Sequence, residues 1–189
     1  MANLLEQDLT GSIFSIRYNP DGQLDPGVVG GAYATAERYG APIRAEKREF
    51  SAMATPKWIL HKVEGGAENT YHINAMKNQP YVNTSEVSNP NDFPKGSGWA
   101  LIPDEDGIPG KVVTLQTELS GFVLKPYGDN ESPIAFNFVI QIPNPNPSSL
   151  HLAEVIGVDP DTKELVVQGH FFPGSPTNPP PQWQFIKVN

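Results

Sequence analysis

The sequence predicts an all-β fold. Of its 189 residues, 38% are hydrophobic, and these apolar residues come in short bursts without a sustained helical period. Pro (20) and Gly (17) separate the bursts, so turns recur throughout the chain. Short strands at regular spacing between turn residues are typical of a β-sandwich or a β-barrel. The nearest approach to a helical pattern, residues 1–8, is too short to form a stable helix alone.

Thirteen segments have the pattern of a strand. The first three alternate apolar and polar residues, and three later ones each contain a Trp with apolar residues among the three positions after it. The others are short apolar segments bounded by turn residues. In chain order the segments are residues 12–18, 32–36, 42–47, 57–63, 70–76, 81–85, 98–102, 111–118, 121–126, 134–142, 150–158, 164–172 and 182–188.

The three tryptophans lie in similar settings: KWILHKVEGG, GWALIPDEDG and QWQFIKVN. Three such strands, the last at the end of the sequence, indicate three units of about four strands, which describes a β-trefoil. Trp58 and Trp99 are 41 residues apart, whereas Trp99 and Trp183 are 84 apart. We therefore expect one β-trefoil domain over residues 1–189 with an insertion in the third unit, at about 129–181. The alternative is that the three short Trp strands are similar by coincidence and do not mark repeat units.

Charge and composition disfavour several classes of partner. The net charge is −8 and no basic cluster occurs, which disfavours binding to nucleic acid or to an anionic membrane surface. No apolar run has the length of a membrane span, and the first residues lack the apolar region of a secretory signal. The expectation is a cytoplasmic monomer. Cysteine is absent, so neither a disulfide framework nor a thiol nucleophile is expected.

No catalytic motif is found in the sequence. The four histidines (61, 72, 151 and 170) fall in four different strands without metal-ligand spacing. His61 and His72 are expected to face each other across a hairpin. The acidic run at 103–107 lacks the ligand spacing of a calcium loop and is interpreted as a solvated turn. The prediction is a protein that is not an enzyme and has no metal or cofactor.

The order of short motifs resembles the mycocypins, the clitocypin and macrocypin cysteine-protease inhibitors of mushrooms. The matching pieces are IFSIRY, GGAYATA, PIRAEKRE, KWILHKV, TYHINAM, GWALIPDEDG, FVLKP and QWQFIKVN. They span most of the chain, but residues 129–181 have no counterpart. GGAYA and the Trp strands are the most specific pieces.

The resemblance implies a β-trefoil that blocks papain-like cysteine proteases with two loops, one between strands 1 and 2 and one between strands 3 and 4. Glycines let a backbone enter a narrow cleft without a Cβ, and Phe50 and Met53 would act as apolar anchors. The protease-binding residues implied here are Asp25, Pro26, Gly27, Val28, Val29, Gly30, Gly31, Phe50, Ser51, Ala52, Met53 and Ala54. A purely local role of Gly30 and Gly31, in a bulge or turn, is the alternative.

Some relatives in the resembled family use a further loop against a second protease. The turn between strands 5 and 6 carries Lys77, which would suit a trypsin-like serine protease, and Asn78, which would suit an asparaginyl endopeptidase (legumain). Arg38, between strands 2 and 3, is another trypsin-type candidate.

Two other classes of function stay open. A carbohydrate-binding β-trefoil lectin would use exposed aromatic residues such as Tyr39, Tyr81 and Tyr127 with loop Asp and Asn residues, although the Gln-x-Trp repeat of ricin-type lectins is absent. A structural or storage protein would use the inserted strands to dock a partner.

Overall fold

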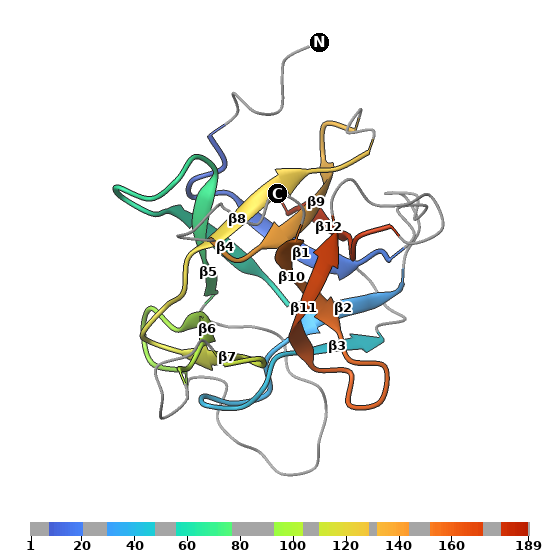
Figure 1. Cartoon of the computed structure of the whole chain (residues 1–189). Coiled ribbons are helices and arrows are strands. Elements are labelled where there is room, and N and C mark those ends of the chain that lie inside the picture. Colours follow the sequence, from blue (N-terminus) through green and yellow to red (C-terminus); the bar gives the residue numbers. More distant parts are fainter. Residues whose placement is uncertain are drawn as a thin grey trace.

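The structure, a computed structural model, describes residues 8–20, 30–47, 56–76, 93–103, 110–128, 132–143, 152–171 and 179–188. In these ranges the chain forms twelve strands of one continuous sheet (Figure 1). The strands are β1 (Ile13–Tyr18), β2 (Ala32–Thr35), β3 (Arg44–Lys47), β4 (Trp58–Lys62), β5 (Thr70–Ala75), β6 (Gly98–Leu101), β7 (Val113–Gln116), β8 (Phe122–Pro126), β9 (Ala135–Gln141), β10 (Leu152–Val158), β11 (Leu165–Phe171) and β12 (Trp183–Lys187).

The predicted all-β class is confirmed. Twelve of the thirteen predicted strands coincide with strands of the structure, and the remaining one, 81–85, lies outside the described residues. The described ranges contain no helix, and so none that could cross a membrane.

Six of the strands close into a ring. β1 pairs with β4, β4 with β5, β5 with β8, β8 with β9, β9 with β12, and β12 again with β1, all antiparallel. Closure satisfies the backbone groups that an open sheet would expose at its edges. The ring therefore forms a barrel without a free edge strand.

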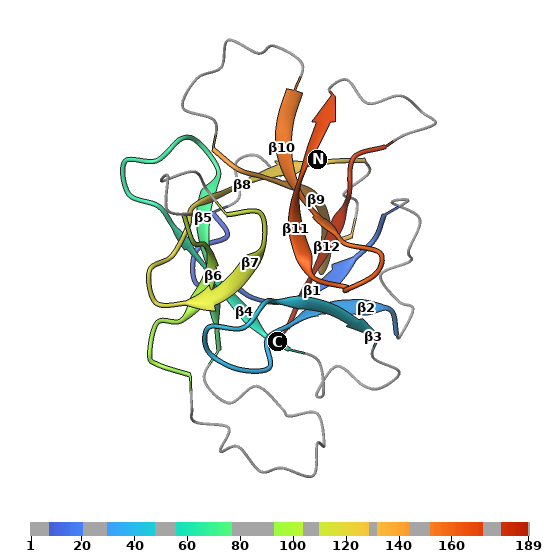
Figure 2. The ribbon, with the colours of Figure 1, turned by 60° about the horizontal axis from the view of Figure 1, so that its bottom comes forward.

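The other six strands form three hairpins, β2–β3, β6–β7 and β10–β11 (Figure 2). Each hairpin lies in the chain between two ring strands, so the order ring strand, hairpin, ring strand occurs three times. The hairpins also contact one another through single bridges: Pro42 with Thr114, Arg44 with Glu164, and Val112 with Val166. The second strands of the three hairpins thus meet in a triangle.

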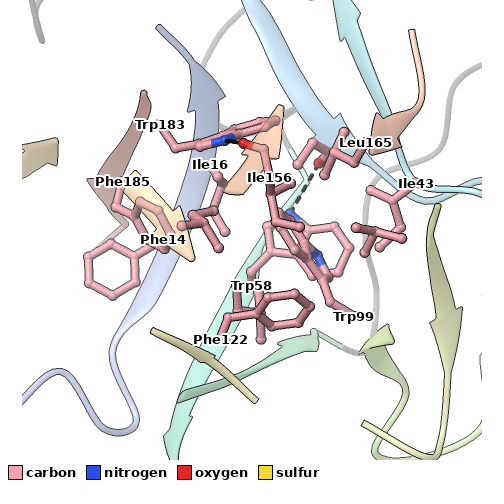
Figure 3. Close-up of a cluster of buried hydrophobic side chains, with 14 of the residues drawn as sticks. Phe14, Ile16, Ile43, Trp58, Trp99, Phe122, Ile156, Leu165, Trp183 and Phe185 are labelled. Atoms are coloured by element: carbon pink, nitrogen blue, oxygen red, sulfur yellow. Dashed lines mark hydrogen bonds between the residues drawn. The ribbon is translucent and has the colours of Figure 1, made fainter. Parts of the chain in front are cut away.

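Trp99 lies at the centre of the aromatic core (Figure 3). Its ring is in edge-on contact with Trp58 of β4, Phe122 of β8 and Trp183 of β12, at centroid distances of 5.6, 5.9 and 6.2 Å. All four side chains are fully buried. Edge-to-face pairs of this kind add to the free energy gained by burying apolar area.

The predicted insertion at about 129–181 needs correction. This segment contains β9, β10 and β11, and β9 is one of the six strands that close the ring. Trp99 belongs to a hairpin strand, whereas Trp58, Phe122 and Trp183 each begin a ring strand. These three positions are 64 and 61 residues apart, so the units are nearly equal in length. The apparent insertion arose because Phe replaces Trp in the second unit.

Candidate functional site

The ends of β1, β2 and β3 lie in one row of the sheet. Tyr18, the last residue of β1, pairs with Ala32, the first of β2, and Ala32 pairs with Lys47, the last of β3. The β1–β2 loop begins and ends at Tyr18 and Ala32, and the β3–β4 loop begins at Lys47. Both predicted binding loops are thus attached to the same end of the barrel.

The β5–β6 loop is attached near the same place. The backbone N–H of Met76, which follows β5, donates a 3.1 Å hydrogen bond to the carbonyl oxygen of Lys57, which precedes β4. Lys57 is therefore where the β3–β4 loop returns to the barrel and Met76 is where the β5–β6 loop leaves it. The β3–β4 loop therefore begins beside the β1–β2 loop and ends beside the start of the β5–β6 loop.

Arg17 in β1 is fully buried beneath the base of the β1–β2 loop. Its Nε donates a 3.1 Å hydrogen bond to Oε1 of Gln184, and Nη2 donates to the same oxygen. Its Nη1 donates a 3.0 Å hydrogen bond to the carbonyl oxygen of Gly30. Burial of a guanidinium is costly unless its donors are satisfied, so these contacts hold Gly30 and Gln184 in fixed positions.

Both glycines of the pair have a backbone conformation that favours glycine. The φ angles are 109° at Gly30 and 114° at Gly31. A Cβ on Gly31 would lie 2.9 Å from Cδ of Arg17, closer than real Cβ contacts occur. The glycine pair therefore has a local structural role, which is to let the loop base pack on the buried arginine. Gly31 is also exposed, so its backbone remains accessible to a partner.

Further polar groups fix the same region. Asn19, directly after β1, is 1% exposed, and its backbone N–H donates a 2.9 Å hydrogen bond to the carbonyl oxygen of Gln182. Its side-chain amide nitrogen donates a 3.3 Å hydrogen bond to Oδ1 of Asn137. Gln184 and Arg17 are directly paired in the register of β12 with β1. The loop base is therefore tied to β9 and β12 as well as to β1.

Sequence reasoning missed Arg17, Asn19 and Gln184. A signal was available, because Arg17 and Gln184 are long polar residues in otherwise apolar strands, IFSIRY and WQFIK. The pairing of two segments 167 residues apart could not be read from either segment alone. The closed ring is what brings them together.

Of the residues that the sequence suggests for binding a protease, the structure describes three: Gly30, Gly31 and Arg38. Gly30 and Gly31 lie at the loop base, and Arg38 lies in the exposed turn between β2 and β3. The others lie outside the described residues: Asp25, Pro26, Gly27, Val28, Val29, Phe50, Ser51, Ala52, Met53, Ala54, Lys77 and Asn78.

The turn that carries Arg38 is fixed to the neighbouring hairpin. The carbonyl oxygen of Arg38 accepts a 3.3 Å hydrogen bond from the N–H of Ala41, and Gly40 has a φ of 79°, as a tight turn requires. The N–H of Gly40 donates a 2.8 Å hydrogen bond to the carbonyl oxygen of Leu115 in β7. Arg38 lies at the opposite end of the β2–β3 hairpin from Ala32, so the structure does not bring it together with the loop bases.

His61 of β4 faces His72 of β5, as the sequence predicted. Burial lowers the pKa of His72, and the nearby His61 lowers it further. No group of three His, Asp or Glu side chains that could hold a metal ion occurs in the described ranges.

In comparisons with protein-family models and with curated protein sequences, nothing matches this chain.

Proposed function

We propose that this chain is a β-trefoil inhibitor of papain-like cysteine proteases, resembling the mycocypins. The β1–β2 and β3–β4 loops would enter the active-site cleft of the protease from its two sides. The observation that carries the proposal is the row Tyr18, Ala32 and Lys47, which attaches both loops to one end of the barrel. Two loops can occupy one cleft only if they leave the scaffold at neighbouring positions.

The β-trefoil assignment is supported by the threefold recurrence of ring strand, hairpin and ring strand. Trp58, Phe122 and Trp183 start the last ring strand of each unit and surround Trp99. A rigid barrel of this kind suits an inhibitor, because function is then carried by loops that can vary without unfolding the core.

The anchoring of the first loop by Arg17 also supports the proposal. An inhibitor gains affinity when its binding loop is held in place before binding, since less conformational entropy is then lost. The hydrogen bonds from Arg17 to Gly30 and Gln184 and from Asn19 to Gln182 fix the base of that loop. Asp25 to Val29 in the first loop and Phe50 to Ala54 in the second would form the contact surface.

A second protease would be bound through another part of the surface. Lys77 and Asn78 follow Met76, which is tied to Lys57 at the base of the β3–β4 loop, so a legumain or trypsin-like protease held there would compete with papain. Arg38 lies at the other end of the β2–β3 hairpin, so a trypsin-like protease bound there would not compete. Binding of papain and trypsin together would therefore assign the trypsin site to Arg38.

The test is an inhibition panel with papain, legumain and trypsin. We expect reversible inhibition of papain, weakened by Val29→Asp in the first loop and by Met53→Asp in the second. Thr117→Asp, which adds the same charge to an exposed position outside both loops, is the matched control and should inhibit papain normally. Absence of inhibition of all three proteases at micromolar protein would refute the proposal.

A further inference from the structure

A surface pocket of about 400 Å³ lies between the β2–β3 turn and the β6–β7 hairpin. Its lining includes Tyr39 from the turn, Ile102 after β6, and Gln116, Thr117, Glu118 and Ser120 from the end of β7 and the segment that follows it. The volume falls within the range of small-molecule sites in proteins. The proposed inhibitory function makes no use of this pocket.

Tyr39 supplies an aromatic wall that is held in place. Its side chain is 41% exposed, and its hydroxyl lies 3.2 Å from Oγ1 of Thr117, within hydrogen-bond distance. The turn on which it lies is fixed by the hydrogen bond from Gly40 to Leu115. An aromatic ring kept partly exposed by such contacts is ready to bind a ligand without further ordering.

A second part of the lining is also preorganised. The hydroxyl of Ser120 accepts a 2.9 Å hydrogen bond from the N–H of Leu101, and the N–H of Ser120 donates a 3.1 Å hydrogen bond to the carbonyl oxygen of Trp99. Ile102, on the rim, is 50% exposed and adds an apolar surface. The lining of the pocket therefore combines an aromatic ring, an apolar side chain and polar groups held by hydrogen bonds.

The remaining polar groups of the pocket define the ligand chemistry. In the described part of the chain, the side chains of Gln116 and Glu118 make no hydrogen bond or ion pair, so their amide and carboxylate can bind a ligand. An amide both donates and accepts hydrogen bonds, and a carboxylate accepts them from hydroxyl groups. The charge of Glu118 and the net charge of −8 disfavour an anion, and the polar wall disfavours a purely apolar ligand.

We propose that this pocket binds a neutral pyranose sugar. The C–H face of the ring would lie against Tyr39, and its hydroxyl groups would bind Gln116, Glu118 and Thr117. The pocket is at the opposite end of the β2–β3 hairpin from Ala32 and Lys47, where the proposed papain-binding loops are attached. Sugar and a papain-like protease can therefore bind together.

The experiment is a titration of the ¹⁵N-labelled protein with neutral methyl glycosides of glucose, galactose, mannose and N-acetylglucosamine, followed by NMR. A single ring has few atoms to contact, so we expect a dissociation constant of about 1 mM, with shifts at Tyr39, Ile102 and Thr117. Tyr39→Ala and Glu118→Gln should each weaken binding by about tenfold. Phe171→Ala, which removes an aromatic ring that is 68% exposed elsewhere, should leave binding unchanged.

Three results would overturn the proposal: no shifts with any glycoside, shifts that map away from the pocket, or binding unaffected by Tyr39→Ala. Deoxy analogues add a further check, because a site that binds a hydroxyl discriminates against its absence. Inhibition of papain, measured on the same samples, should be unchanged by Tyr39→Ala and by saturating sugar. Failure of the sugar site would thus be seen separately from failure of the inhibitory function.

Discussion

Nη1 of Arg17 donates a 3.0 Å hydrogen bond to the carbonyl oxygen of Gly30, joining a fully buried side chain of the barrel to the last residues of the β1–β2 loop. This bond explains the glycine pair in physical terms. The carbonyl of Gly30 points toward the arginine, and Gly31 has no side chain that would displace it. The same geometry that satisfies a buried charge also fixes the loop proposed to bind a protease.

Replacement of Arg17 by Met should destabilise the protein. Met fills part of the space but leaves Oε1 of Gln184 and the carbonyl of Gly30 without the donors they now have. The loss of a buried hydrogen-bonded network of this kind lowers the free energy of unfolding by about 1–3 kcal/mol. Urea unfolding followed by circular dichroism measures this loss.

The same variant should inhibit papain less well, because the first loop would lose its anchor. Lys47→Met is the matched control, since it removes an exposed cation from the base of the other loop and should change stability by no more than about 0.5 kcal/mol. An Arg17→Met protein with unchanged stability would contradict the structural role assigned to this residue.

Gly31→Ala should lower both stability and inhibition. A φ of 114° strains an alanine by about 1–3 kcal/mol, and the added Cβ lies 2.9 Å from Cδ of Arg17. Arg17 cannot move aside easily, because its guanidinium is bonded at two places. Thermal unfolding and inhibition constants are the measurements.

The close packing of Gly31 on Arg17 changes how a Gly31 variant can be interpreted. Loss of inhibition by Gly31→Ala would not by itself show contact with a protease, since the loop base would also be disturbed. Val29→Asp separates the two effects, because it lies beyond the packed glycines in the sequence. We expect a stable protein with weakened inhibition, and a Val29→Asp protein that inhibits like the parent would count against the first loop as a contact.

The sequence was sufficient to predict most strands, because alternation and turn residues are local properties. It was insufficient to predict where each of the three repeat units begins and ends. The shared motif predicts that Trp99 is the counterpart of Trp58, whereas the packing equates Trp58 with Phe122. Phe122 keeps a large, fully buried side chain at the start of a ring strand, although the residue is Phe and not Trp.

The candidate site could be predicted in part for a similar reason. The glycine pair is distinctive in the sequence itself, whereas its contact with Arg17 depends on the pairing of β1 with β2. Gln184 comes from β12, and the contact with Arg17 exists only when β12 returns to pair with β1. Contacts between residues so distant in sequence follow from topology, which no single segment contains.

Trp99→Ala should be among the most destabilising single substitutions in the chain. Trp99 is fully buried and contacts three aromatic rings from three ring strands. Deleting a large aromatic side chain from a core leaves a cavity and costs about 3–5 kcal/mol. Trp99→Phe, which keeps an aromatic ring at this position, serves as the second variant and should show a smaller loss in urea unfolding.

Trp183→Phe provides the comparison for the aromatic core. Its Nε1 donates a 2.7 Å hydrogen bond to the carbonyl oxygen of Ile156, whereas Nε1 of Trp99 is buried without a partner in the described residues. The substitution at Trp183 therefore adds the loss of a buried hydrogen bond, about 1 kcal/mol, to the loss of ring area. Trp99→Ala with near-parental stability would show that Trp99 does not lie at the centre of the core.

Stability should depend on pH through His72. Burial, and secondarily His61, lowers the pKa of His72 in the folded protein below the unfolded value of about 6.5. Between these two pKa values the unfolded chain binds more protons, so stability rises with pH. The contribution of His72 is complete above the unfolded pKa and is lost as the pH falls through the folded pKa.

NMR titration of the imidazole signals measures the folded pKa of His72 directly, and urea unfolding at a series of pH values measures the consequence. His72→Gln should reduce the pH dependence on the acid side of neutrality. His61→Gln should move the pKa of His72 upward only in part, because burial is the larger cause and would remain. A full return of the His72 pKa to the unfolded value in His61→Gln would mean that repulsion between the two imidazoles, and not burial, controls this pair.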